Sequence, residues 1–352
     1  MGFLRGSSAS EELSCVEVDS LVAEEAIRVL RSRGLLIRSA RVLKVEGGRR
    51  VRIPVPEDLV DVAVSALSAL GVEVERCRDR FKLGSRGVRY VDLLRGRVPE
   101  GVLAVLPRSY QVVGDLVLVH LPEEVLPYGE VIGEALARVA RVRAVYAVSL
   151  TEGEFRIRRI SKLWGEGGAE TVHTEYGVRI YVDLSRSYFN PTLSYEHWRL
   201  SEEVRDGERV LDLFSGVGAF SLHIAFKRYA TCVAVDSNPH AIAALVRSTT
   251  LNKLKGRVVP VVSRVEDVGE LLPRESFSRV IVDLPHKSLE YLELAADFVE
   301  RGGYIHLYAL GSEDPTEIVS RIGGAPYRLV ELRRVLDYSP RRYVYGVKLL
   351  KE

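Results

Sequence analysis

The stretch "RVLDLFSGVGAFSLHIAF", residues 209–226, contains an apolar run that ends in Asp212, a pair of glycines, and a second apolar run with helical spacing. The continuous apolar character of the first run predicts a buried strand. Gly216 and Gly218 predict a tight turn, because glycine lets the backbone approach a ligand and lets the following helix pack closely on the strand. The stretch therefore predicts a strand–turn–helix unit in a mostly parallel α/β sheet.

A second strand-like run, residues 232–236, ends in Asp236, which lies 24 residues after Asp212. An acid at this position can accept hydrogen bonds from both hydroxyls of a ribose, so the spacing predicts a nucleoside-containing cofactor. A dinucleotide site would need a third glycine, and Ser221 stands there instead. The turn is better suited to a cofactor without phosphates, such as S-adenosylmethionine, whose ammonium could be held near Asp212.

Three domains are predicted along the 352-residue chain. Residues 1–83 combine two helical patterns with paired apolar runs, which predict a small α+β domain. Residues 84–185 begin with a connector that contains scattered glycine and proline and continue as a strand-rich middle domain. In residues 186–352 apolar strands alternate with helices, which is typical of a mostly parallel sheet covered on both faces.

The net charge of +2 does not by itself demand a polyanionic partner. The distribution of charge is more informative, because residues 28–52 contain nine basic residues and one acid, Glu46. Such a one-sided stretch is compatible with a nucleic-acid-binding surface and equally with an ordinary solvated basic face. Both interpretations stay open at this stage.

The three cysteines, Cys15, Cys77 and Cys232, are too few and too scattered for a disulfide framework or a zinc site. We therefore expect buried apolar thiols and no metal. No apolar run approaches the roughly 20 residues of a membrane span, and the first residues lack the apolar core of a signal peptide. A cytoplasmic protein that makes no contact with membranes is expected.

The stretch "RVIVDLPHKSLEYL", residues 279–292, ends an apolar run with Asp283 and Pro285 before helical spacing resumes. Polar residues and proline routinely end strands, so the stretch can be a simple strand terminus. It can also be a functional corner, because proline fixes φ and makes the turn rigid. The choice depends on which other residues the fold brings to this place.

Several motifs together resemble the archaeal and eukaryotic tRNA (guanine-37-N1)-methyltransferases, whose wybutosine-pathway relatives share much of the layout. The resemblance is carried by "LDLFSGVGAF", "AVDSNPHAI", "DLPH", "GEFRIRRI" and "YFNPTLSYEHWR", and it extends over nearly the whole chain. It implies a class I S-adenosylmethionine-dependent methyltransferase domain with a Rossmann-like fold, a middle domain, and an N-terminal module that binds tRNA.

Methylation of guanine at N1 requires a general base, because N1 carries a proton that must leave as the methyl group arrives. Negative charge then develops on O6, where a cation or a hydrogen-bond donor lowers the barrier. The resemblance implies that Glu196 is the base and that Arg156 is the partner of O6. Without the resemblance, Glu196 would be interpreted as an acid stabilised by a helix N-terminus, and Arg156 as a solvated strand residue.

The resemblance also implies a role for the corner at Asp283, which would accept hydrogen bonds from the donor edge of guanine and would be the third catalytic residue. Arg264 stands where the family commonly has an acid that faces the adenine amine, so Val265, Glu266 or Asp267 would supply that contact. His197 replaces a usual arginine. The expected cofactor-binding residues are Tyr188, His197, Asp212, Gly216, Gly218, Asp236, Ser237, Arg264, Val265, Asp283 and Pro285.

Three functions are compatible with these residues. The first is N1-methylation of guanosine 37 in the tRNA anticodon loop, with a tricyclic wyosine precursor, 4-demethylwyosine, as a second substrate. The second is transfer of the aminocarboxypropyl group of the same cofactor to tRNA. The third is a non-catalytic tRNA-binding protein. The expected partner is tRNA, whose anticodon loop offers unstacked bases that can be read on their edges. Contact with the tRNA elbow and a monomeric protein are also expected.

Overall fold

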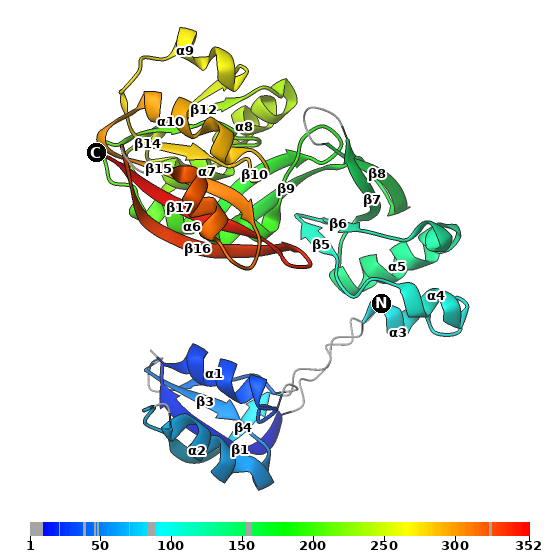
Figure 1. Cartoon of the computed structure of the whole chain (residues 1–352). Helices are drawn as coiled ribbons and strands as arrows, with labels where there is room; N and C mark the ends of the chain where they lie inside the picture. Colours follow the sequence, from blue (N-terminus) through cyan, green and yellow to red (C-terminus); the bar gives the residue numbers. More distant parts are fainter. Residues whose placement is uncertain are drawn as a thin grey trace. The chain divides into compact units, whose positions relative to one another are not determined.

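The computed structural model describes residues 10–20, 22–37, 40–45, 47, 49–69, 71–82, 89–152, 157–323 and 326–352. Contacts between residues divide the chain into two compact units, Met1–Leu93 and Leu94–Glu352. Figure 1 shows the elements of each unit. The expected three-part division at residues 83/84 and 185/186 stays a prediction. In the described part of the chain, no helix is long and apolar enough to cross a bilayer.

The first unit is a four-stranded antiparallel sheet with two helices packed on it, in the order β2-β3-β1-β4. Its core consists of apolar side chains from β1 and β3 and from the inner faces of both helices. This is the small α+β arrangement that the sequence predicts. The elements are β1 (Ser10–Asp19), α1 (Ala23–Ser32), β2 (Leu43–Val45), β3 (Arg50–Pro54), α2 (Val60–Ser68) and β4 (Glu75–Lys82).

Two cysteines of this unit correct the expectation of free thiols. Cys15 on β1 lies directly opposite Cys77 on β4, and the two form a disulfide with a Cα–Cα distance of 4.8 Å. The antiparallel register brings together residues that are 62 positions apart, which cysteine spacing alone does not reveal. Cys232 is a buried free thiol, as expected. In intracellular proteins such disulfides are rare outside hyperthermophiles.

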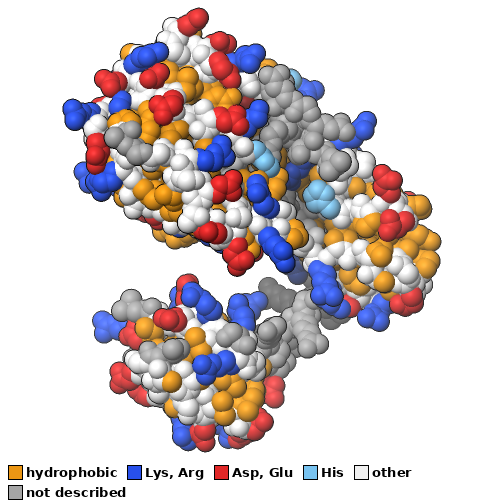
Figure 2. Space-filling view, viewed as in Figure 1, with side chains coloured by type: hydrophobic (Ala, Val, Ile, Leu, Met, Phe, Trp, Pro, Cys, Tyr) orange, Lys and Arg blue, Asp and Glu red, His pale blue; other side chains and the backbone are white. Residues whose placement is uncertain are grey.

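Part of the basic stretch 28–52 is neutralised within the first unit. Arg50 donates to Glu17 at 3.0 Å, and Arg52 donates to Glu17 at 2.5 Å and to Asp79 at 2.7 Å. These contacts lower the pKa of Glu17, with the hydrogen bond from Arg52 as the largest cause. On the face that Figure 2 shows, acidic and basic side chains are interspersed over this unit. The stretch is therefore not a uniformly basic surface.

The second unit begins with a mixed sheet in the order β5-β6-β7-β8, in which α5 connects the parallel pair β6 and β7. The β9–β10 hairpin follows and shares one hydrophobic cluster with β6, β7, α7 and α8. The elements are α3 (Tyr90–Leu94), which crosses the boundary between the units, α4 (Glu100–Val105), β5 (Gln111–Val113), β6 (Leu116–Val119), α5 (Gly129–Ala140), β7 (Ala144–Glu152), β8 (Ile157–Gly165), β9 (Glu170–Glu175) and β10 (Val178–Asp183).

The rest of the unit is a seven-stranded sheet in the order β13-β12-β11-β14-β15-β17-β16. The first five strands are parallel, and β17 runs antiparallel to both of its neighbours. The elements are α6 (Ser194–Glu203), β11 (Arg209–Asp212), α7 (Ala219–Lys227), β12 (Thr231–Asp236), α8 (Pro239–Leu251), β13 (Arg257–Val262), α9 (Val268–Leu271), β14 (Phe277–Val282), α10 (Leu292–Phe298), β15 (Val299–Gly311), α11 (Thr316–Ile322), β16 (Tyr327–Ser339) and β17 (Arg342–Lys351).

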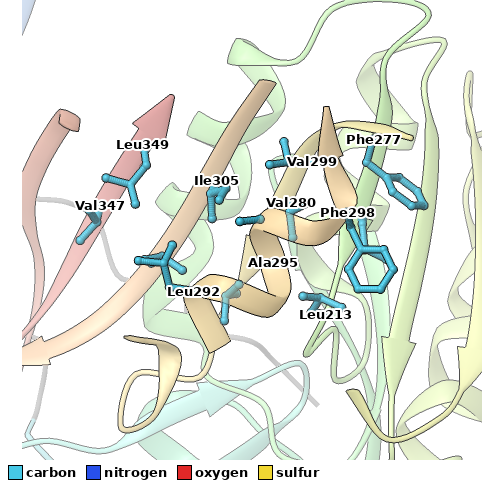
Figure 3. Packing of buried hydrophobic residues seen from close by; sticks show 14 of the residues in the cluster. Leu213, Phe277, Val280, Leu292, Ala295, Phe298, Val299, Ile305, Val347 and Leu349 are labelled. Carbon is cyan, nitrogen blue, oxygen red and sulfur yellow. The ribbon is translucent and has the colours of Figure 1, made fainter. Parts of the chain in front are cut away.

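The sheet is buried between layers of helices, as the continuous apolar strands predict. Figure 3 shows Leu292 and Ala295 of α10 packed near Val280 of β14 and Ile305 of β15. Ala295, Val280 and Ile305 are completely buried. Because the five parallel strands all end at one edge, the loops that follow them meet there, which is where α/β sheets bind ligands.

Candidate active site

A cavity of about 610 Å³ lies at the carboxyl edge of the parallel strands. This volume is in the range of small-molecule and cofactor sites. The lining comes from the loops after β11, β12, β13 and β14, from the segment before α6 and the first turn of α6, and from the β16–β17 hairpin. It includes Tyr188, His197, Gly216, Asp236, Ser237, Arg264, Val265, Glu266, Asp283, Pro285, His286, Leu336, Tyr338 and Val344.

The glycine turn after β11 has the geometry that the sequence predicts. Gly216 and Gly218 have φ values of +52° and +79°, in the left-handed region that favours glycine. A Cβ atom at Gly218 would lie 2.2 Å from Leu245 Cδ1, so glycine here lets α7 begin close against Leu245 of α8. At Gly216 the nearest atom of the described residues to such a Cβ would be the Tyr188 carbonyl oxygen, at 3.9 Å, so the backbone there is open to a ligand.

Asp236 at the end of β12 is fixed by two backbone donors. Its Oδ2 accepts from the Gly216 N–H at 2.8 Å, and its Oδ1 accepts from the Asn238 N–H at 2.8 Å. Burial raises the pKa of Asp236, and these two hydrogen bonds oppose the rise. Each carboxylate oxygen retains a further lone pair, and the residue lines the cavity. The pair therefore fits the two hydroxyls of a ribose.

Asp212 is completely buried and lies behind the residues that line the cavity. Ser221 Oγ donates to its Oδ2 at 2.8 Å, whereas Oδ1 has no hydrogen-bond partner among the described residues. Burial raises the pKa of Asp212 to about 7, and the nearby Asp283 and Asp236 contribute to the rise. A cationic ligand group would offset this cost, which fits the expected ammonium.

The loop after β13 supplies an acid where the sequence leaves its source open. Arg264, Val265 and Glu266 all line the cavity, whereas Asp267 is not among its lining residues. Glu266 accepts from the Tyr291 hydroxyl at 2.9 Å, and the Arg264 guanidinium lies 3.6 Å away. Hydrogen bonds from its own backbone N–H and from Tyr291 lower the pKa of Glu266, so it is an ionised acceptor.

The corner after β14 is part of the cavity wall and not only a strand terminus. Asp283, Pro285 and His286 line the cavity. The Leu310 N–H donates to the Pro285 carbonyl at 2.8 Å, which fastens the corner to β15. His286 Nε2 lies 3.0 Å from the Tyr338 hydroxyl, which links the same corner to β16.

Tyr188 connects the cavity to the middle region of the chain. The Arg158 guanidinium lies 4.9 Å from the centroid of the Tyr188 ring, and its Nη1 donates to Gln111 Oε1 at 2.7 Å. A cation on the face of an aromatic ring is stabilised by the ring quadrupole. Arg156, the expected partner of guanine O6, lies outside the described residues.

Glu196 occupies the first turn of α6 and is 2% exposed. Arg333 on β16 donates to its Oε2, and the Tyr308 hydroxyl and Arg199 Nε lie 3.4 Å and 3.5 Å from the same oxygen. Burial raises the pKa of Tyr308, so its hydroxyl remains a donor. Glu196 does not line the cavity, although the next residue, His197, does. Sequence reasoning missed Arg333 and Tyr308.

His197 is oriented by a buried carboxylate. Its Nδ1 lies 2.8 Å from Glu175 Oε2, and His223 Nε2 lies 3.2 Å from the same oxygen. Burial raises the pKa of Glu175, but the hydrogen bonds from His197 and His223 outweigh it and bring the pKa to about 2. One carboxylate oxygen of Glu175 and one ring nitrogen each of His197 and His223, which could act as metal ligands, lie within 4.8 Å of one another. The two short distances are those of hydrogen bonds, so this cluster holds the His197 ring against the cavity.

The fold and the site define a class I S-adenosylmethionine-dependent methyltransferase, and comparisons with known proteins agree. The TRM5/TYW2 methyltransferase domain matches residues 171–326, and the TYW2 N-terminal domain matches residues 90–168. The tRNA (guanine(37)-N(1))-methyltransferase Trm5b of Methanocaldococcus jannaschii is 31% identical over 339 residues, which cover 95% of this chain and 97% of that protein.

Two further Trm5 proteins are similar to most of the chain. Trm5b of Pyrococcus abyssi is 34% identical over 70% of this chain and 76% of its own length. The solved complex of aTrm5 and tRNALeu superposes with a TM-score of 0.67 at 29% identity and covers 96% of this chain and 99% of that one. The chain belongs to the TRM5/TYW2 methyltransferase family, and S-adenosylmethionine is its cofactor.

The buried Asp212 predicts a pH dependence of stability. Between an unfolded pKa of about 3.9 and the folded value of about 7, the folded chain keeps a proton that the unfolded chain has lost. The free energy of unfolding therefore falls as the pH rises through this window, by up to about 1.4 kcal/mol per pH unit. Above the folded pKa the stabilisation from the protonated carboxyl group is lost, and the free energy of unfolding no longer changes with pH through this group.

Urea denaturation at pH 5 and pH 8 of the wild type and of Asp212→Asn measures the effect. The wild type should lose stability relative to the variant between the two values, because the variant has no carboxyl group at this position. An equal change in both proteins would show that Asp212 titrates normally.

Proposed function

We propose that this protein is a tRNA methyltransferase that transfers the methyl group of S-adenosylmethionine to N1 of guanosine 37 in the anticodon loop. The observation that carries the proposal is that Asp236 lines the cavity while the buried carboxylate Glu196 directly precedes another lining residue, His197. Similarity to Trm5b proteins over nearly the whole chain supports the same activity.

The cofactor supplies a methyl group activated by a sulfonium, and the chain supplies the proton acceptor. Glu196 takes the proton from N1 once guanine replaces Arg333 as its partner, and the nearby Arg199 balances its charge before transfer. Asp283 accepts hydrogen bonds from the 2-amino edge of guanine. Arg156 stabilises the charge that develops on O6.

A second base substrate is favoured by one comparison. The tRNA 4-demethylwyosine(37)-methyltransferase Taw21 of Saccharolobus solfataricus is 29% identical over 67% of this chain and 91% of its own length. A carboxylate at the corner, Asp283, suits the donor edge of guanine. Methylation of the tricyclic base at the same position is therefore the second candidate activity.

Transfer of an aminocarboxypropyl group is the competing reaction, because a Pyrococcus horikoshii enzyme with that name is 28% identical over 74% of this chain. The presence of Glu196 next to the cavity favours methyl transfer, which needs a base at N1. A non-catalytic role would not explain the cavity that Gly216 and Asp236 line, because binding tRNA alone requires no cofactor. We further propose that the protein is a cytoplasmic monomer and that residues 1–83 contact the tRNA elbow.

Mass spectrometry of tRNA identifies the product directly. Unmodified tRNA incubated with the protein and labelled cofactor should gain about 14 daltons on the nucleoside at position 37, because a methyl group replaces a proton. A gain of about 101 daltons would identify aminocarboxypropyl transfer instead. The same incubation with tRNA that carries 4-demethylwyosine at position 37 tests the second substrate: methylation of that base, with no gain on guanosine 37 in unmodified tRNA, would assign it as the main one.

The proton acceptor is tested by Glu196→Gln, which preserves shape but cannot accept the proton. Single-turnover methylation should fall by about 100-fold or more with little change in tRNA affinity, because the base acts only in the transition state. Glu202→Gln, a half-buried acid further along the same helix that pairs with Lys227 and not with Arg333, is the matched control. A wild-type rate in Glu196→Gln would remove this residue from the mechanism and make Asp283 the leading candidate.

A further inference from the structure

The β16–β17 hairpin forms one wall of the cavity. Leu336, Tyr338 and Val344 belong to the lining, and Leu336 lies opposite Val344 in the antiparallel register. Figure 1 shows the hairpin, in orange-red and red, as a long ribbon at the edge of the sheet. The motifs for the cofactor do not include this hairpin, so its place in the cavity calls for a separate function.

The strand order places the cavity between two groups of lining residues, one after β12 and β13 and the other on the β16–β17 hairpin. Asp236 and Arg264 follow β12 and β13, which lie on one side of β11 and β14. The hairpin lies on the opposite side of β14, beyond β15. The corner at Asp283 follows β14 itself and is therefore between the two groups. A cofactor whose ribose is held at Asp236 leaves the hairpin end for the group that accepts the methyl.

The candidate base is on the hairpin side. Glu196 contacts Arg333 of β16 and Tyr308 of β15, and both of these strands lie beyond β14. Arg333 and Tyr308 are themselves neighbours across β17, because both are paired with Gly346. The target base must therefore come close to the hairpin when its proton is removed.

Tyr338 is placed to contact that base or its neighbour. It is 46% exposed, and among the exposed large hydrophobic side chains of the described residues it alone lines the cavity. Its ring packs edge-on against His286, with centroids 5.2 Å apart and an interplanar angle of 80°. The contact between the Tyr338 hydroxyl and His286 Nε2, at 3.0 Å, fixes the ring orientation. An exposed aromatic ring held rigidly at a cavity rim is a stacking platform.

The tip of the hairpin adds positive charge beside this ring. Arg341 lies in the turn between the two strands and Arg342 is the first residue of β17, and both are exposed. The nearest acid in the chain, Asp337, is already paired with Arg334, whose guanidinium lies over the Tyr343 ring at 3.5 Å. The two tip guanidinium groups are thus not balanced by Asp337. An aromatic ring next to exposed cations suits single-stranded nucleic acid, which offers bases for stacking and phosphates for pairing.

We propose that the tip of the β16–β17 hairpin, residues 338–342, binds the single-stranded RNA loop that carries the target base. Tyr338 stacks on a nucleobase at the mouth of the cavity, and Arg341 and Arg342 contact phosphates of the same strand. This inference rests on the proposed tRNA substrate. It adds a binding element on the acceptor side, formed by a part of the chain that the cofactor does not need.

The experiment measures equilibrium binding of tRNA to the full chain by fluorescence, with 2-aminopurine at position 37 as the probe of base unstacking. Tyr338→Ala should raise the tRNA Kd by about 5- to 100-fold and reduce the fluorescence change, because a stacked base is lost. Tyr338→Phe keeps the ring and loses only the hydroxyl contact with His286, so its Kd should lie much closer to the wild-type value than that of Tyr338→Ala. Tyr229→Ala, which removes a 65% exposed tyrosine outside the cavity lining, is the matched control.

The arginines are tested through salt dependence. The double variant Arg341→Ala/Arg342→Ala should lower the slope of log K against log salt by about 1.4, the value for two phosphates of a single strand. Arg301→Ala, an exposed arginine near the start of β15, should leave the slope unchanged. In every variant, calorimetric binding of S-adenosylmethionine should match the wild type, which shows that the protein is folded.

Wild-type tRNA affinity in Tyr338→Ala would overturn the proposal, as would equal weakening in Tyr338→Ala and Tyr338→Phe, because only the hydroxyl would then matter. Unchanged salt slopes in the double arginine variant would remove the phosphate contacts. These outcomes are separate from the proposed activity. If the wild type methylates guanosine 37 while Tyr338→Ala binds tRNA normally, the hairpin inference fails and the activity stands.

Discussion

The hydrogen bond from the Gly216 N–H to Asp236 Oδ2, at 2.8 Å, joins the turn after β11 to the end of β12. It fixes the glycine turn against the neighbouring strand, and the Asn238 N–H fixes the other oxygen of the same carboxylate. The left-handed backbone at Gly218 lets α7 pack on Leu245 behind this turn. The cofactor end of the cavity therefore depends on one carboxylate that organises two loops while it keeps lone pairs for a ligand.

The proposed chemistry depends on a second carboxylate, which lies outside the cavity lining. Glu196 is almost completely buried and is bound by Arg333 and Tyr308, so its charge is balanced before any substrate arrives. Arg333 lies on β16 of the hairpin, and Tyr308 lies on β15, which pairs with the hairpin strand β17. The candidate proton acceptor thus depends on the β15–β17–β16 side of the sheet, whereas the loops after β11, β12 and β13 form the candidate cofactor end of the cavity.

The sequence predicts the parts of the molecule whose signals are local. The acid at Asp236 and the glycine turn are read directly, because residue type and spacing along one strand–turn–helix unit determine them. Cys15 and Cys77 were misjudged, since only the register between two strands brings them together. The pairing of Glu196 on α6 with Arg333 on β16, which are 137 positions apart, was missed because the packing of a helix on a distant strand has no sequence spacing either. Contacts across the antiparallel edge of a sheet leave no pattern in a single sequence.

The most direct test of the account is the affinity for S-adenosylmethionine of Asp236→Ala, measured by calorimetry on the full chain beside the wild type. Loss of the carboxylate leaves two ribose hydroxyls unpaired and frees the Gly216 N–H, so we expect binding to weaken by about 1–3 kcal/mol, or roughly 5- to 150-fold. Thermal unfolding of the variant serves as the control for folding. A folded Asp236→Ala protein with wild-type affinity would contradict the account, because the cofactor would then not be held at the turn that organises the site.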